Sequence, residues 1–185
     1  MRPVAVVADT THYLPRELVA ASEINEVSLY VHWQGRQDRE AELPDFDAYY
    51  EYMRTAPDLP TTSQPSVGDF LKVFEPLVAD GRDVVSIHIA GGMSGTYESA
   101  LQAKARLEED LGEERVTVID SVTACGGLGL MALAASAGNE PPFQTPTVDV
   151  CHRLTRSASG GSPCWRAGCR GSRTRGRSRP RRTIQ

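Results

Sequence analysis

Short apolar runs alternate with segments of helical period along the first 138 residues. Four runs read as strands: residues 4–8, 27–31, 84–89 and 116–119. Patterns typical of helices occupy residues 45–54, the segments that follow Ser66 and Ser94, and residues 127–137. Strands separated by helices form right-handed crossovers, and strands that are apolar throughout are covered on both faces. The pattern therefore predicts an α/β fold, a doubly wound parallel sheet, over residues 1–138.

Residues that favour helix starts stand in front of two of these segments and at a third place, Pro15. Pro15 suits the first position of a helix. Ser66 and Asp69 have the spacing of a capping box. Ser94 is placed to cap the helix that follows it. We expect each helix to begin at these residues.

The composition changes sharply after Gly138. Residues 1–150 hold all 24 acidic residues against ten of the 20 basic ones, a net charge of −14, whereas residues 151–185 hold ten arginines and no acid. No helical or strand period continues there, so residues 139–185 are expected to form a disordered or poorly packed tail. An arginine-rich segment without acids is typical of a GC-rich gene read out of frame. We therefore interpret the tail as a possible frameshift product.

Targeting and metal signals are weak. The first apolar run ends at Asp9, too short for a signal peptide, and no run of about 20 apolar residues predicts a membrane span. We interpret the protein as cytoplasmic, with its cysteines reduced. Cys151, His152, Cys164 and Cys169 match no standard zinc spacing. Neither a metal nor a cofactor is expected.

Small polar residues follow three of the predicted strands. Asp9 to Thr11, Gly91 to Thr96, and Asp120 to Thr123 would meet at the carboxyl edge of a parallel sheet, where ligands bind. Gly91–Thr96 opens a helix, its glycines allow backbone N–H groups to approach a ligand, and its hydroxyls add donors. A carboxylate or phosphate would suit this loop. The alternative is a plain glycine turn with Ser94 as an ordinary N-cap.

Four motifs, in order, resemble those of the DegV family. They are Asp9-Thr10-Thr11 with Leu14-Pro15, Thr62-Ser63-Gln64-Pro65-Ser66, Ser94-Gly95-Thr96-Tyr97 with Ser99-Ala100, and Ile119-Asp120-Ser121. Taken alone, the segment from Pro60 to Ser66 reads as an ordinary loop. Together the motifs span residues 4 to about 138, roughly half of a full family member.

The resemblance implies a long-chain fatty-acid carrier without catalysis of its own. Family members bury the acyl chain in an apolar tunnel, hold its carboxylate with hydroxyls, and in bacteria present it to a fatty acid kinase for phospholipid synthesis. Carried over by position, Thr62 and Ser94 hold the carboxylate, and Gly95 and Thr96 shape the helix start beneath it. Ser63 and Ser121 are expected to lie next to the residues that contact the carboxylate and to hold them in place. Asp9 is expected to accept backbone hydrogen bonds rather than to touch the ligand.

The sequence departs from the family after residue 138. A second domain that covers the tunnel, a histidine near the carboxylate and an Arg-Gly-Gly-Arg-Ile type segment are all missing from it. His152 has no matching context and receives no role. We expect lipid binding to be impaired by this truncation.

Three other functions remain as alternatives. Gly91–Thr96 could belong to a phosphate- or nucleotide-binding α/β module, although no Gly-x-Gly-x-x-Gly follows the first strand and no Gly-Lys-Ser/Thr occurs. A hydrolase using Ser94 would require glycine where Thr96 stands. The arginine-rich tail would bind nucleic acid only through nonspecific phosphate contacts. His88 alternates with apolar strand residues and is expected to be a hydrogen-bonded core histidine.

Overall fold

A four-stranded parallel sheet forms the centre of the protein. The computed structural model describes residues 2–43 and 46–138. The sheet has the order β2-β1-β6-β7, with all neighbours parallel. Its strands are β1 (Val4–Asp9), β2 (Asn25–Val27), β6 (Asp83–His88) and β7 (Val116–Asp120). The predicted parallel sheet is confirmed.

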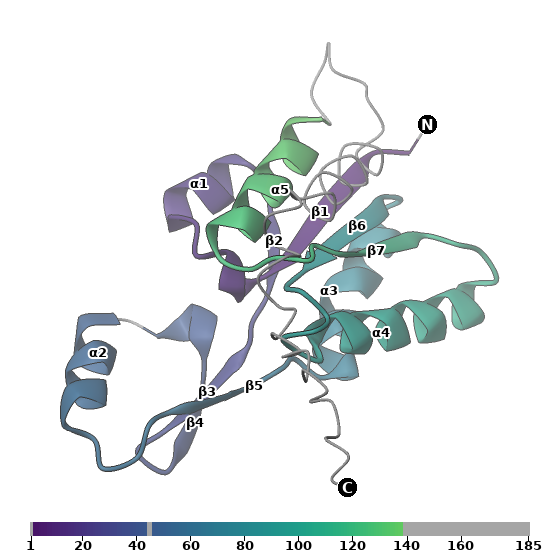
Figure 1. Cartoon of the computed structure of the whole chain (residues 1–185). Helices are drawn as coiled ribbons and strands as arrows, with labels where there is room; N and C mark the ends of the chain where they lie inside the picture. The colour runs from purple at the N-terminus through teal and green to yellow at the C-terminus, as the bar shows by residue number, and fades with distance from the viewer. Residues whose placement is uncertain (1, 44–45, 139–185) are drawn as a thin grey trace, which may run out of the picture.

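Helices cover both faces of this sheet (Figure 1). One face packs against α1 (Arg16–Ala21) and α5 (Gly126–Ala137), around Ile87, Leu128 and Ala132. The other packs against α3 (Val67–Ala79) and α4 (Thr96–Leu111), around Phe70 and Phe74. Two apolar cores therefore sandwich the sheet, which confirms the doubly wound arrangement and explains why the strands are apolar on both faces.

A second, antiparallel sheet extends from the first (Figure 1). It has the order β4-β3-β5 and contains β3 (Tyr30–Trp33), β4 (Arg36–Arg39) and β5 (Thr61–Ser63). The helix α2 (Phe46–Thr55) and the short 3-10 helix η2 (Glu40–Glu42) lie between β4 and β5 in the chain. The sequence did not predict this sheet, because β4 is wholly polar and β5 lies in a segment that reads as a loop.

The predicted strand over residues 27–31 is wrong: the chain there changes sheets. β2 ends at Val27 in the parallel sheet, and β3 begins at Tyr30 in the antiparallel one. Between them, the Leu29 amide donates to Thr10 Oγ1 at 3.2 Å, and Ser28 Oγ donates to the Leu29 carbonyl at 2.8 Å. Side chains therefore satisfy the backbone where the ladder stops, a cause that apolar pattern alone does not reveal.

The helix starts agree with the sequence in one case and differ by one or two residues in two others. Ser66 Oγ accepts from the Asp69 amide at 3.2 Å, and the Asp69 carboxylate accepts from the Ser66 amide at 3.0 Å, which confirms the capping box. α1 begins at Arg16, one residue after Pro15. The predicted N-cap role of Ser94 is wrong, because Gly95 is the N-cap and Thr96 the first helical residue of α4.

The expected tail, with its disorder, its frameshift origin and its cysteines at 151, 164 and 169, lies outside the described residues. Within residues 2–43 and 46–138, no helix is both long enough and apolar enough to cross a membrane.

We expect Ser66→Ala to lower the free energy of unfolding by about 1 kcal/mol, because α3 loses the side-chain acceptor for its Asp69 amide. Urea unfolding followed by circular dichroism measures the change. Ser99→Ala, within α4, is the matched control, and should be neutral or slightly stabilising because alanine has the higher helix propensity. Equal effects of the two substitutions would contradict the assigned cap.

Candidate functional site

Three loops meet at the carboxyl edge of the parallel sheet. They are the 3-10 helix η1 (Thr10–His12) after β1, residues 90–95 after β6, and residues 121–125 after β7. The Ala90 amide donates to the Thr123 carbonyl at 2.8 Å, and the Ser121 amide donates to the His88 carbonyl at 3.0 Å. The polar segments singled out in the sequence therefore lie side by side.

Asp9 joins two of these loops. Its side chain is fully buried and accepts from the Thr11 amide at 3.1 Å, the Ile89 amide at 2.9 Å and His88 Nδ1 at 3.1 Å. Burial would raise the pKa of Asp9, but the hydrogen bonds from His88, Thr11 and Ile89 outweigh it and hold the pKa below its usual value. Asp9 fixes loops through backbone hydrogen bonds, as expected.

Three N–H groups of the glycine-rich loop donate to acceptors of the protein. The Gly91 amide donates to Asp120 Oδ1 at 3.2 Å, and the Met93 and Ser94 amides both donate to the Ala90 carbonyl. The expectation that Gly91 turns its amide toward a ligand is therefore wrong. Asp120, which sequence reasoning gave no role in this loop, is the acceptor that fixes the turn.

Ser94 and Thr96 form a hydroxyl pair at the start of α4. Their Oγ atoms are 2.9 Å apart, and Ser94 Oγ also accepts from the Thr96 amide at 3.3 Å. Thr96 is fully buried, whereas Ser94 is half-buried. The buried Thr96 therefore fixes the half-buried Ser94 hydroxyl at the edge of the sheet. The neighbour of this serine is a hydroxyl and not the imidazole that a hydrolase would need.

The two family-like motifs that are far apart in sequence come together at Gly95. A Cβ atom placed on Gly95 would lie 2.8 Å from the Gln64 side-chain nitrogen, so the Gln64 amide rests on this glycine. Gln64 is exposed and follows directly after β5. The sequence analysis assigned it no role. Its position between the serines of the motif was the available signal.

The remaining predicted residues have varied surroundings. Thr62 is exposed on β5, opposite the buried Val31. Ser63 Oγ contacts His32 Nε2 at 2.9 Å, within the antiparallel sheet. Ser121 is fully buried, and its hydroxyl donates to the Thr123 carbonyl at 3.1 Å. The structure thus groups Ser94, Gly95 and Thr96, and gives Ser63 and Ser121 partners of their own.

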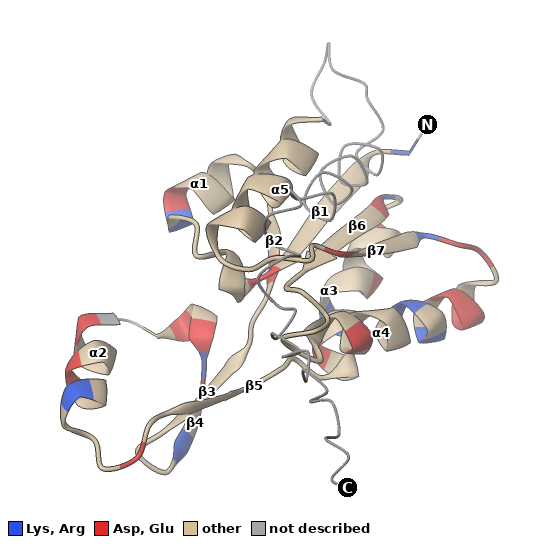
Figure 2. Ribbon diagram, in the orientation of Figure 1, with Lys and Arg blue, Asp and Glu red and all other residues tan. Residues whose placement is uncertain are grey.

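The edge is neutral to acidic and partly apolar. The three loops contain no lysine or arginine (Figure 2), so neutral donors would have to hold an anion there. Each loop also exposes one large apolar side chain: Tyr13 is 55% exposed, Met93 70% and Val122 53%. The edge therefore combines hydroxyls with an apolar rim.

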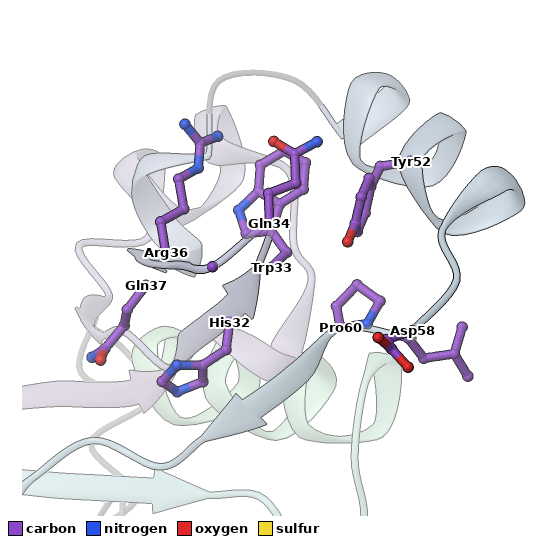
Figure 3. Close-up of a pocket in the computed structure, with 10 residues that line it drawn as sticks. His32, Trp33, Gln34, Arg36, Gln37, Tyr52, Asp58 and Pro60 are labelled. Carbon is purple, nitrogen blue, oxygen red and sulfur yellow. The ribbon is translucent and has the colours of Figure 1, made fainter.

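A separate pocket of about 530 Å³ lies in the antiparallel sheet, lined by His32, Trp33, Tyr52 and Asp58 among others (Figure 3). None of the predicted ligand-binding residues lines it, although His32, which does, contacts Ser63. In the described part of the chain, no cluster of three or more His, Cys, Asp or Glu side chains is placed to hold a metal ion.

Sequence comparison identifies relatives of the chain. The family model described as "Uncharacterised protein, DegV family" matches residues 3–139. A DegV domain-containing protein of Listeria monocytogenes is 39% identical over 142 residues, covering 75% of this chain and 49% of that protein. Protein DegV of Bacillus subtilis is 34% identical over 133 residues, 72% of this chain and 46% of that one. The chain spans about half the length of these curated relatives.

Solved structures show the same fold. A DegV family protein of Thermus thermophilus, described by its fatty acid binding, superposes with a TM-score of 0.72 at 32% identity, covering 84% of this chain and 54% of that one. DegV of Bacillus subtilis, described as a fatty acid binding protein, gives 0.73 at 31% identity, with the same coverage. Both superpositions cover most of this chain and about half of the other protein.

The buried Asp9 carboxylate predicts a loss of stability in acid. Because its pKa is lower in the folded chain than its unfolded value of 3.8, its contribution is complete above that pH and is lost as the pH falls through the folded pKa. We expect Asp9→Asn to reduce the slope of unfolding free energy against pH below about 4. Chemical unfolding from pH 2 to 7 measures it.

Asp58→Asn, at an exposed acid, is the control, and the slope in Asp9→Asn should be lower than the slope in Asp58→Asn. The other carboxyls with lowered pKa, Asp69, Glu108 and Glu113, are present in both variants and cancel in the comparison. Identical acid profiles for Asp9→Asn and Asp58→Asn would show that Asp9 does not titrate as described.

Proposed function

The chain belongs to the DegV family, and on this premise we propose that it binds a long-chain fatty acid whose carboxylate is held by loop hydroxyls. Thr62 and Ser94 would make the contacts, with Gly95 and Thr96 shaping the helix start and Ser63 and Ser121 supporting the loops behind. The observation that carries the proposal is the contact between Gln64 and Gly95, which joins the two hydroxyl-bearing motifs at one edge of the sheet.

The hydroxyl pair supports a carboxylate over a phosphate. A phosphate cradle needs several convergent backbone N–H groups, but the Gly91 amide already donates to Asp120, and the Met93 and Ser94 amides to the Ala90 carbonyl. The Ser94 hydroxyl accepts from the Thr96 amide, and it can donate to a ligand when Thr96 donates the hydrogen bond between the two hydroxyls. One or two hydroxyl donors are enough to orient a carboxylate, since a hydrogen bond to a charged group contributes about 1.5–3 kcal/mol.

The apolar rim supports an acyl chain. Tyr13, Met93 and Val122 surround the same edge and are more than half exposed. Each buried methylene contributes about 0.8 kcal/mol, so most of the affinity for a long acyl chain would come from apolar contact rather than from the carboxylate. The similar proteins from Thermus thermophilus and Bacillus subtilis are both described as binding fatty acids.

We further propose that the protein acts as a carrier rather than as an enzyme, and that it presents its ligand to a fatty acid kinase in the cytoplasm for phospholipid synthesis. The family resemblance is the support for this partner. The chain spans about half the length of its curated relatives, and we propose that this half alone binds fatty acid more weakly than it does within a full-length relative.

We expect Thr62→Ala and Ser94→Ala each to weaken palmitate binding on the order of tenfold, because each removes one hydrogen bond to the carboxylate. Isothermal titration calorimetry measures the affinity. Thr55→Ala is the matched control, because the Thr55 hydroxyl donates to the Glu51 and Tyr52 carbonyls of its own helix α2. Unchanged palmitate affinity in both variants would show that Thr62 and Ser94 do not bind the carboxylate.

Native mass spectrometry of the purified chain separates the two ligand classes. A co-purified mass of a long-chain fatty acid supports the carrier. A bound nucleotide or phosphate ester would instead favour the α/β phosphate-binding function that the Gly91–Thr96 loop also suggests.

A further inference from the structure

Three buried polar side chains form a continuous chain beneath the candidate site. Ser86 Oγ lies 2.6 Å from His88 Nε2, and His88 Nδ1 lies 3.1 Å from Asp9 Oδ2. All three residues are 0% exposed. They connect the middle of β6 to the carboxyl end of β1.

The strand geometry places these residues together. Ser86 and His88 are two residues apart on β6, so they share the face that α3 and α4 cover. Ala8 pairs with Ile87, which brings Asp9 beside His88. The Phe70 ring meets the His88 ring edge-on at a centroid distance of 5.0 Å. In such apolar surroundings, polar groups persist only when each is hydrogen-bonded.

One tautomer of His88 satisfies both of its hydrogen bonds, to Asp9 and to Ser86. Nδ1–H donates to the Asp9 carboxylate, and Nε2 accepts from the Ser86 hydroxyl. Asp9 then accepts from His88, from the Ile89 amide, and from both the amide and the hydroxyl of Thr11. Removing the Ser86 hydroxyl would leave Nε2 without a donor in a dry core and free the ring to turn from Asp9.

The order serine, histidine, aspartate is that of a hydrolase triad, but the surroundings are not. A nucleophilic serine must reach a substrate, whereas Ser86 is fully buried between the sheet and α3. These three hydrogen-bonded side chains therefore position the backbone and do not react with a substrate. What it positions is the segment that begins at Ile89, whose amide Asp9 holds, and that leads directly to Ser94.

We propose that Asp9, His88 and Ser86 form a positioning relay that fixes the main chain entering the Ser94 loop, and so sets the affinity of that loop for the head of its ligand. The last clause rests on the proposed function. The first concerns the loop alone and is testable without any ligand.

Hydrogen–deuterium exchange of the full chain tests the relay in Ser86→Ala. Val84→Ala is the matched control, because Val84 lies on the same strand and face and is 1% exposed. After correction for each variant's global stability, the Ile89 and Ala90 amides should exchange on the order of tenfold faster in Ser86→Ala than in Val84→Ala. The amides of Val6 and Val85, in the centre of the sheet, should show no such difference.

A spectroscopic measurement keeps the test independent of folding. The His88 Nδ1 proton should give a slowly exchanging imidazole resonance in the unchanged chain, which disappears or shifts in Asp9→Asn and moves in Ser86→Ala. Equal loop exchange in Ser86→Ala and Val84→Ala, or an imidazole resonance that neither substitution alters, would overturn the relay.

Palmitate titration of the same proteins separates the two proposals. If the unchanged chain does not bind palmitate, the proposed function fails while the exchange comparison still decides the relay. If it binds, Ser86→Ala should bind more weakly than Val84→Ala at a temperature where both are folded. Equal affinities in these two variants would refute the link between relay and ligand.

Discussion

The hydrogen bonds of one buried carboxylate hold the functional edge together. Asp9 closes β1 and accepts donors from the loop after its own strand and from the loop after β6. Parallel strands are not linked by tight turns, so their carboxyl-end loops have no covalent reason to keep a fixed distance. The buried Asp9 carboxylate holds them together instead. A buried charge is costly unless it is hydrogen-bonded, and Asp9 keeps its hydrogen bonds only while both loops remain in place.

The fold of this chain could largely be inferred from the period of its apolar residues. Strands buried on both faces are apolar throughout, and residues 4–8, 84–89 and 116–119 showed this directly. The antiparallel sheet could not be found in the same way. Arg36–Arg39 presents no apolar face, and β5 is three residues long, so both are strands because β3 pairs with them rather than because of their own composition.

The grouping of the three loops was inferred correctly, but their internal hydrogen bonds were not. The carboxyl ends of parallel strands share an edge by topology, so the grouping of the loops followed from the strand order. Which groups face outward depends on hydrogen bonds that spacing does not encode. The Gly91 amide turns to Asp120, and Gln64 rests on Gly95, both through contacts between residues about 30 apart in sequence. The roles of Thr62, Ser63 and Ser121 toward a ligand stay predictions.

The Thr10 hydroxyl couples the two sheets. It accepts from the Leu29 amide at the point where the chain leaves the parallel sheet, and it donates to the buried Glu40 beyond β4. The outlying sheet is thus anchored at both ends of its β3–β4 hairpin to a single side chain of the first loop. Because the same hydroxyl holds the entry and the exit of this hairpin, the placement of β3 and β4 relative to the parallel sheet depends on the position of η1.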